Sequence, residues 1–498
     1  MSRLHYNWMV GPVALVLFAL LPLAAGAQNQ PDQQSQQGQS QPNQNEQNSN
    51  QSAAPIPAYH SPFASGIENS DSSAGTEDLE PDTRALSGVQ TLSLGSLKES
   101  HSYWQPHADI SASADSNVQQ TASGSQWGSW VTFSGGVDVH HVSSNNDLMF
   151  SYTGGGMFSS DTGTSNGMVQ ELGFSERLAL RRWTVGFFDQ FSYFPESAFG
   201  FGGSTGVPFT GGTNAGIGSS FSVGQTLLVG QGRTVSNSLA TEGDYALSPR
   251  SSITLAGGYG LLNYPDNSLL NAWTANARIG YNYLLTQKDT LALLYTYSAF
   301  RYNNYNQFID THSVQISYGR RVTGRLAFQI SAGPEIALSR LPISGTPSAA
   351  PTTNSTELFW SLQTSTQYQL RRVGLNLTYD HGVSSGSGVL AGSISDNVQG
   401  SATRQMSPTF SSELLAGYSR NSGLAIGVFP PTNQSYNYWY VGTNLNHPWG
   451  NVGVTFSYQL QYQDSNGTFC TGASCGTSLI RHVISLGVGW HGGRVLFR

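Results

Sequence analysis

Apolar and polar side chains alternate with a period of two along most of this chain. In the clearest run, Arg325–Ser339, Leu326 and Phe328 share one face, and Gln329 and Ser331 share the other. Successive side chains of a β-strand point to opposite faces, so the run predicts a strand with one apolar and one polar face. The same alternation recurs in Asn271–Leu285, Thr290–Arg301, Val373–Ser384 and Asn451–Asp464.

Segments of about ten residues that alternate in this way are typical of transmembrane β-barrels, whose strands face lipid on one side and a polar lumen on the other. The pattern predicts about eighteen strands: His107–Val118, Gly128–Val142, Asp147–Met157, Met168–Arg181, Trp183–Phe194, Arg233–Leu247, Ser251–Asn263, Asn271–Leu285, Thr290–Arg301, Asp310–Val322, Arg325–Ser339, Thr356–Leu370, Val373–Ser384, Ala391–Gln405, Thr409–Ser422, Ser435–His447, Val452–Asp464 and Ser478–Trp490. The first and Ala391–Gln405 have the weakest alternation, so sixteen strands is the alternative count.

The links between these segments alternate in length. Short links such as Arg181-Arg182, Thr323-Gly324 and Arg371-Arg372 are followed by longer ones such as Leu341–Ser355 and Ser465–Thr477. Outer-membrane barrels have short periplasmic turns and longer extracellular loops. The chain is therefore predicted to be an all-β, antiparallel, up-and-down barrel, and the even strand count places both of its ends in the periplasm.

The composition fits this fold class. Charged residues make up 10% of the 498 residues, against about a quarter in an ordinary soluble domain. Mean hydropathy is nevertheless slightly hydrophilic, because Ser, Thr, Asn and Gln are abundant. Such side chains can line an aqueous lumen, whereas charges are disfavoured on a lipid-facing surface. The net charge of -7 gives no indication of nucleic-acid binding.

The N-terminal part divides into two segments. Residues 1–27 carry an apolar run, Val13–Leu23, that ends at Ala25-Gly26-Ala27, and this predicts a cleavable secretory signal peptide. The run is shorter than the roughly 20 residues of a membrane-spanning helix, which is the competing interpretation. Residues 28–105 begin with a Gln/Asn/Ser-rich stretch and are predicted to be a disordered periplasmic lead-in to a barrel at 106–498.

Two features outside the strands are candidates for function or stability. Cys470 and Cys475 lie in one predicted extracellular loop and are expected to form a disulfide in an exported protein. A metal pair is the alternative, but no His or third Cys lies in that loop, so no metal site is predicted. The Gly-rich segment Pro195–Gly232 is long enough to be functional, either folded into the lumen as a constriction or placed outside it.

Charged side chains on the polar faces are the candidate lumen-lining residues: Asp138, Glu171, Arg177, Glu242, Asp244, Arg278, Arg325, Glu335, Asp380 and Glu413. Their mixed signs predict weak or local ion selectivity, or pairing among themselves. Asp189 departs from the pattern, because it falls on the apolar face with Phe187 and Phe191. Either a bulge shifts the register there or Asp189 lies beyond the lipid.

Evidence for catalysis or for a cofactor is thin. Asp138 and His140 share a strand face, which keeps a hydrolase among the alternatives. Asp380-His381 and His312-Ser313 are neighbours and so point to opposite faces. No phosphate-binding loop, metal cluster or nucleotide motif occurs in the sequence, and the protein is predicted not to be an enzyme and to need no cofactor.

Two segments carry a resemblance to a known family. The strand that ends in Tyr245-Ala-Leu-Ser-Pro-Arg250 and continues into Ser251–Tyr259, together with Asp109–Asn117, resembles a group of β-barrel porins found in exopolysaccharide gene neighbourhoods. The resemblance covers about His107 to Arg498. It implies insertion by the barrel-assembly machinery, which reads a terminal aromatic residue; here Phe497 is the penultimate residue.

These features predict a channel of the cell outer membrane, in contact with its lipid, for passive diffusion of small polar solutes, with saccharides as candidates. The amide- and hydroxyl-rich faces suit neutral hydrogen-bonding solutes better than ions. The first alternative is an accessory barrel in exopolysaccharide export or surface attachment, and the second is an outer-membrane hydrolase. The sequence leaves the oligomeric state open.

Overall fold

The computed structural model describes residues 102–118, 126–159, 166–195, 233–265, 270–303, 308–323, 325–342, 352–370, 372–386, 390, 392–407, 409–424, 435–466 and 478–497. The predicted signal peptide, nearly all of the lead-in, residues 196–232 of the Gly-rich segment, and both cysteines lie outside these ranges. Within them, no helix is long and apolar enough to cross a membrane.

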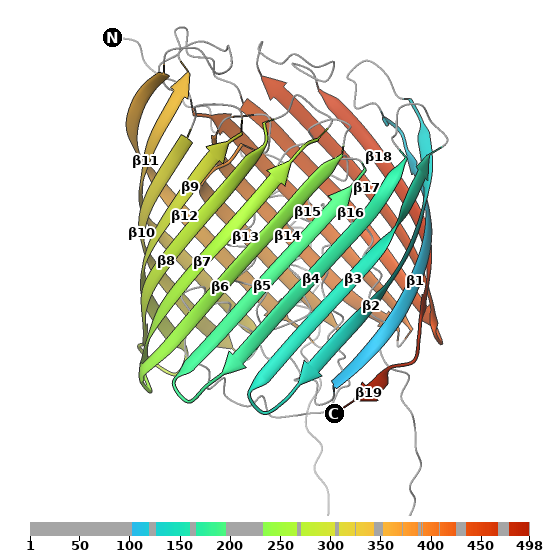
Figure 1. Ribbon diagram of the computed structural model, residues 1–498, viewed down its shortest axis with the longest axis horizontal. Coiled ribbons are helices and arrows are strands. Elements are labelled where there is room, and N and C mark those ends of the chain that lie inside the picture. The colour runs from blue at the N-terminus through green and yellow to red at the C-terminus, as the bar shows by residue number, and fades with distance from the viewer. Residues whose placement is uncertain are drawn as a thin grey trace, which may run out of the picture. The chain divides into compact units, whose positions relative to one another are not determined.

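The described residues form a single antiparallel sheet (Figure 1). Its strands are β1 (Ser102–Asp115), β2 (Gly128–Val142), β3 (Asn146–Ser159), β4 (Gly167–Ala179), β5 (Trp183–Phe194), β6 (Thr234–Ser248), β7 (Ser251–Asn263), β8 (Ala272–Leu284), β9 (Asp289–Tyr302), β10 (Phe308–Thr323), β11 (Leu326–Pro342), β12 (Thr352–Gln369), β13 (Val373–Ser384), β14 (Ser393–Ser407), β15 (Phe410–Gly423), β16 (Ser435–Trp449), β17 (Val452–Asn466), β18 (Leu479–His491) and β19 (Val495–Phe497). Each of the first eighteen pairs with its neighbours in sequence.

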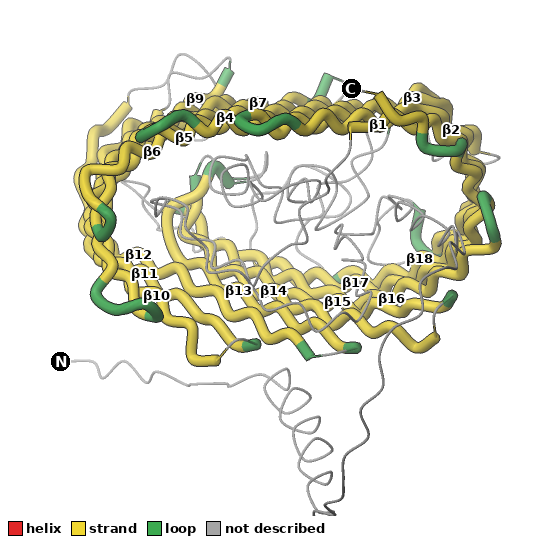
Figure 2. The backbone as a smooth tube through the Cα atoms, turned by 90° about the horizontal axis from the view of Figure 1, so that it is seen from below, coloured by secondary structure: helices red, strands yellow, loops and turns green. Residues whose placement is uncertain are grey.

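The sheet closes on itself. β18 pairs with β1 over nine residues, from His107 opposite His491 to Asp115 opposite Val483. Figure 2 shows the resulting ring of strands. The predicted eighteen-stranded barrel is confirmed, and the alternative of sixteen strands is wrong. Both weakly alternating segments, now β1 and β14, are full members of the ring.

β1 begins earlier than the alternation indicates. Its first residues, Ser102–Trp104, pair with the short strand β19, which the sequence analysis missed, and the barrel therefore starts before residue 106. Pro106 lies where β1 changes its neighbour from β19 to β18, so its missing N–H leaves no gap in a regular ladder there. A strand of three residues is too short to show a period.

The apolar face of the sheet is the outer one. On β9, Leu291, Leu293 and Tyr295 are exposed, whereas the alternating residues Ala292 and Leu294 are buried in the wall. The outward charges Asp289 and Arg301 flank this apolar stretch. At about 3.3 Å per residue and a tilt of about 40°, they are roughly 30 Å apart along the barrel axis, close to the height of a membrane-spanning apolar band.

The links confirm the predicted alternation in length and define two rims. The short-turn rim holds the links that follow even-numbered strands, such as Gly450-Asn451 between β16 and β17. Gly450 has a φ of 62°, a conformation that two-residue hairpin turns require and that glycine adopts without strain. The long-loop rim holds the links that follow odd-numbered strands.

At the long-loop rim, the ends of β13 and β14 turn into the barrel. The β12–β13 ladder stops at Leu362 opposite His381, whereas β13 and β14 stay paired up to Ser384 and Ser393. Tyr302 of β9 donates a hydrogen bond to the backbone carbonyl of Ser385, 2.9 Å away. The tube in Figure 2 shows strand ends inside the ring. The described part of β12 beyond Leu362 consequently pairs only with β11.

Apolar packing holds this inturned end. Val383 and Ile394 belong to the outward face by alternation, yet they pack against a buried inner-face cluster of Ala272, Phe300, Tyr302, Ile309, Ala337 and Leu424. Gly392, with a φ of 89°, lies against the Ile309 side chain, and a Cβ there would come within 2.1 Å of Ile309 Cδ1. The inturned end is thus a packed part of the inner wall.

A buried ion pair joins the first and last long strands. The Arg481 guanidinium of β18 contacts Asp115 Oδ2 of β1, with Nε at 2.6 Å, and neither side chain is exposed to solvent. Removing one partner of a buried pair leaves the other charge uncompensated, which is typically destabilising by about 3–5 kcal/mol.

We expect Asp115→Asn and Arg481→Met each to lower the free energy of unfolding by about 3–5 kcal/mol, because each leaves a buried group unpaired. The double variant should lose less than the sum of the two, since no lone charge remains. Urea unfolding of the refolded barrel in vesicles measures this. Arg404→Gln, at an exposed position on the rim, is the control and should change stability by less than about 1 kcal/mol. Additive losses would contradict a direct coupling.

Candidate functional site

The lumen wall is the candidate site, and the ladders decide which side chains belong to it. Residues directly opposite each other on neighbouring strands share a face, so the assignment can be carried around the whole ring. It returns to β1 without a change of face, because Asp115 and Arg481 both point inward with Gln461 and Gln463. The inner surface is dominated by Ser, Thr, Asn and Gln.

Nine of the ten candidate lumen-lining residues lie on the inner face: Asp138, Glu171, Arg177, Glu242, Asp244, Arg278, Glu335, Asp380 and Glu413. Arg325 is the exception. β11 begins one residue later, at Leu326, and Arg325 lies exposed in the turn that precedes it. The alternation was extended one residue too far, because a turn residue no longer follows the period of the strand.

Asp189 lies on the outer face, as its sequence position indicates. The ladders of β5 with β4 and β6 run without a shift, so the bulge interpretation is wrong. Asn237, directly beside it on β6, donates a hydrogen bond from Nδ2 to Asp189 Oδ1 at 2.8 Å. A neighbouring amide therefore partners the carboxylate on the outer surface.

One row of the wall carries charges of alternating sign. Following paired residues from β3 to β11, the row contains Asp147, Arg177, Glu242, Arg278 and Glu335 in that order. Strands are about 4.8 Å apart, and successive charges in the row lie one to three strands apart, so they are separated by roughly 5–15 Å. Each charge thus has opposite charges as its nearest charged neighbours in the row, which limits the field of the row in the lumen.

The inner wall as a whole is acidic. Its described strands carry eleven carboxylates against four guanidinium groups, an excess that the sequence analysis missed. The residues it did not single out are Asp109, Asp115, Asp147, Glu357, Arg321 and Arg481. Their ladder positions could have been read from the same alternation. This excess favours cations over anions in the lumen.

Individual charged groups of the inner face are held by hydrogen bonds to neutral side chains. Arg278 Nε donates to Thr296 Oγ1 at 3.2 Å, and Thr254 Oγ1 donates to Asp244 Oδ1 at 2.5 Å. Glu413 Oε2 accepts a hydrogen bond from Asn444 at 3.1 Å. These bonds fix the direction of the charged groups, so the wall presents a defined pattern to a solute.

Three polar side chains form a line across β1, β2 and β3. Asp138 Oδ2 lies 3.2 Å from His107 Nδ1, and His107 Nε2 lies 3.0 Å from Thr153 Oγ1. His107 and Thr153 are both paired with Gly136, which lies between them. Because Gly136 has no side chain, the His107 ring can extend across β2 to reach Thr153.

The line has the order acid, base, hydroxyl that activates a nucleophile in hydrolases. His140, which the sequence analysis associated with Asp138, lies 2.8 Å from Asp147 instead. Thr153 sits in regular ladders on both sides, so the nearby backbone N–H groups are engaged and form no oxyanion hole in the described wall. No group of metal ligands occurs among the described residues.

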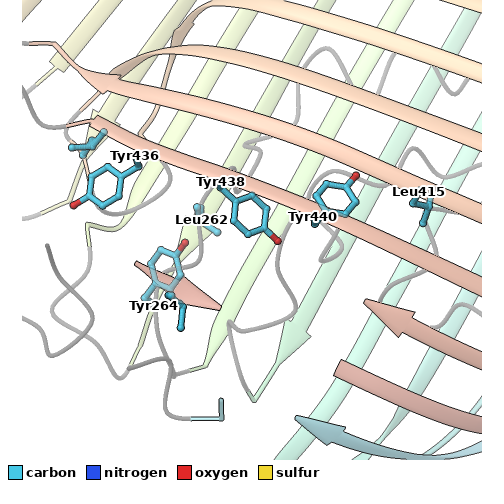
Figure 3. Close-up of a cluster of buried hydrophobic side chains, with 8 residues drawn as sticks. Leu262, Tyr264, Leu415, Tyr436, Tyr438 and Tyr440 are labelled. Atoms are coloured by element: carbon cyan, nitrogen blue, oxygen red, sulfur yellow. The ribbon is translucent and has the colours of Figure 1, made fainter. Parts of the chain in front are cut away.

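An apolar cluster crosses the lumen towards the long-loop rim. It joins Leu262 and Tyr264, at the end of β7, with Leu415 of β15 and with Tyr436, Tyr438 and Tyr440 of β16 (Figure 3). β7 and β16 are nine strands apart in a ring of eighteen, so they lie on opposite walls. Leu390, from the inturned link between β13 and β14, belongs to the same cluster. The lumen is therefore narrowed at this level.

Beside this cluster, polar groups are buried without a partner. Gln461 is fully buried, and neither of its side-chain amide atoms has a hydrogen-bond partner among the described residues; the same holds for Gln459 Oε1. Gln461 is paired with Tyr440, and Gln463 with Tyr438. We call this surface of Tyr436, Tyr438, Tyr440, Gln459, Gln461 and Gln463 the Tyr–Gln wall.

Comparison with known proteins shows likeness only at the level of solved structures. No protein-family model and no curated protein matches the chain. Similar solved structures include the outer membrane protein OpdK of Pseudomonas aeruginosa (8% identity, 78% of this chain and 99% of that chain, TM-score 0.38) and OpdQ of the same organism (10%, 78% and 97%, 0.38). The ferric citrate transporter FecA is similar at 8% identity, 80% of each chain and a TM-score of 0.38.

Identities and TM-scores this low carry no argument about function. The assignment of the barrel fold is based on the strand pairing described above. The similarity to the porins of exopolysaccharide gene neighbourhoods stays a prediction, as does the absence of enzymatic activity.

The passage of His107 over Gly136 gives a matched test. A Cβ at Gly136 would come within 1.9 Å of the Tyr152 carbonyl oxygen and 2.6 Å of His107 Nε2, whereas the nearest atom to a Cβ at Gly135 is 3.5 Å away. We expect Gly136→Ala to destabilise the barrel by about 1–3 kcal/mol and Gly135→Ala to have little effect. Urea unfolding in vesicles compares them; equal stability of the two variants would contradict the packing described here.

Proposed function

We propose that this protein is an outer-membrane pore for the passive diffusion of small polar solutes, with neutral saccharides as the favoured class. The barrel has an exposed apolar exterior and an interior of hydroxyl and amide groups. Closed barrels of this kind can span lipid because strand hydrogen bonds are made within the ring; here the described part of β12 beyond Leu362 departs from this, pairing with β11 only. The long-loop rim would then face the outside of the cell.

The observation that carries the choice of solute is the Tyr–Gln wall. Buried amide groups normally have hydrogen-bond partners, so the bare amide of Gln461 calls for a bound polar molecule or water. Sugar hydroxyls are donors and acceptors at once and match an amide on both counts. The tyrosine rings on the paired strand are buried in the apolar cluster, so a sugar would contact their flat faces by displacing part of that cluster.

The direct test is reconstitution of the purified chain in planar bilayers and liposomes. We expect small single-channel steps, because the lumen is narrowed by the inturned link and the apolar cluster, and faster liposome swelling in small neutral sugars than in large ones. An absence of both conductance and swelling would overturn the proposal. Loss of surface polysaccharide on deletion of the protein, with unchanged solute uptake, would favour the export alternative.

Ion preference follows from the acidic wall. In a salt gradient the zero-current potential should have the sign of a cation-preferring pore, because carboxylates outnumber guanidinium groups on the described inner face. Asp380→Asn combined with Glu413→Gln should move this potential toward zero. Arg420→Gln, on the outer face, is the control and should leave it unchanged. An anion preference would contradict the inner-face assignment.

The Tyr–Gln wall is tested by Gln461→Leu. Replacing a buried unpartnered amide with an apolar group of similar size should leave the barrel as stable as before or more so. Neutral-sugar swelling should slow, since the amide that meets the hydroxyls is gone, while conductance in simple salt stays the same. Swelling rates and single-channel conductance of the same preparation measure both. An unchanged swelling rate would show that Gln461 does not contact the passing sugar.

The Asp138–His107–Thr153 line supports one second candidate, hydrolysis of an ester within the lumen. Thr153→Val keeps the size of the side chain and removes the hydroxyl. If the purified barrel hydrolyses chromogenic esters and Thr153→Val abolishes that activity, the second candidate holds. If no ester is hydrolysed, the line is a structural hydrogen-bond network.

A further inference from the structure

Basic side chains collect on the short-turn rim. Six consecutive turns, from the one between β4 and β5 to the one between β14 and β15, carry exposed Arg or Lys in the turn or at its edge. The residues are Arg181, Arg182, Arg250, Lys288, Arg320, Arg325, Arg372 and Arg404. We call this set the basic rim. The described acidic groups near it on the outer face are fewer: Glu176 and Asp289, the latter 3.6 Å from Arg320.

The apolar outer surface extends down to these turns. Leu180, Leu247, Leu285 and Val322 follow the outward face of their strands to its last residues, and 40–58% of each is exposed. Each lies within three residues of a member of the basic rim. The edge of the hydrocarbon layer must therefore reach the turns, since exposed apolar side chains of a membrane barrel are covered by lipid. The basic groups then lie at the level of the lipid headgroups and do not reach far into the aqueous space.

One turn of the rim forms a groove. Its walls are Leu180, Arg181, Arg182, Trp183 and Tyr245. The Trp183 and Tyr245 rings lie 4.8 Å apart, on paired outward-facing positions of β5 and β6. The backbone carbonyl of Arg182 accepts a hydrogen bond from Ala246 N at 2.8 Å, which fixes the turn against the next strand. The groove combines two guanidinium groups with aromatic and aliphatic surface.

We propose that the basic rim binds the headgroups of anionic phospholipids in the adjoining leaflet, with the Arg181–Tyr245 groove as its best-formed site. Guanidinium groups pair with phosphate in a bidentate manner, and tryptophan and tyrosine favour the interface between headgroups and acyl chains. A soluble acidic partner would use only the basic side chains of the rim and leave the apolar surface beside them uncovered. The adjoining exposed leucines favour lipid, because one molecule then covers both the charged and the apolar surface.

This inference rests on the proposed membrane location of the barrel. It predicts an asymmetry, with anionic lipid bound at the short-turn rim. The interaction has a charged component, so it weakens as salt rises, because exposed charges are screened over about 10 Å at 0.1 M salt.

The test uses the full chain, refolded in a non-ionic detergent and titrated with phosphatidylglycerol, cardiolipin or phosphatidylcholine while bound lipid is counted by native mass spectrometry. We expect the two anionic lipids to be retained and phosphatidylcholine to be lost. Arg181→Gln combined with Arg182→Gln should weaken anionic-lipid binding about tenfold, since each basic group near an anionic surface contributes substantially to binding. Arg420→Gln, near the opposite rim, is the control and should bind as the unmodified chain does.

Equal retention of phosphatidylcholine, or unchanged binding by the double variant, would overturn the inference. Displacement of the lipid by soluble polyglutamate at the same charge concentration would also overturn it, in favour of a soluble acidic partner. Conductance of the same samples separates this result from the proposed function. If the barrel binds anionic lipid but conducts no ions, the proposed pore function is wrong, while the proposed lipid binding at the basic rim stands.

Discussion

Closure of the sheet is the constraint on which the rest of the structure depends. A strand edge carries unpaired N–H and C=O groups, and in lipid these groups have no water to satisfy them. Pairing β18 with β1 removes the edge over most of their length. At the long-loop rim, the buried Arg481–Asp115 ion pair joins β18 to the end of β1. At the other rim, β19 pairs with the first residues of β1.

Closure also fixes which side chains meet which medium. Because side chains alternate, all residues of one parity in a strand share a face, and in most strands here the more apolar set falls outside. The lumen then receives most of the uncharged polar side chains. This explains why a chain with few charged residues concentrates carboxylates on its inner wall, and why many are held by hydroxyl and amide donors such as Thr254 and Asn444.

The inturned end of β13 and β14 is where the barrel departs from a uniform ring. Where β12–β13 pairing is lost beyond Leu362, Val383 and Ile394 pack against the cluster that contains Phe300 and Ile309, and Tyr302 donates a hydrogen bond to Ser385. Alternation assigns Val383 to the outer face of the sheet, and the ladder agrees. Because the sheet bends inward at this end, that face packs on the inner wall and narrows the lumen instead of facing outward.

The sequence by itself determined the fold class and the face of nearly every candidate residue, because a period of two along a strand is a local property; it left the strand count at eighteen or sixteen, which strand pairing decided. Asp138 and Glu335 could be placed on the inner face without knowing which strands pair with theirs. The tertiary structure decided what depends on register between strands: that His107 reaches Thr153 over Gly136, that Asp147, Arg177 and Glu242 share one row, and that Tyr264 and Tyr438, from opposite walls, join one apolar cluster. These contacts join residues far apart in the chain. They depend on the register between paired strands, which cannot be read from the sequence of one strand.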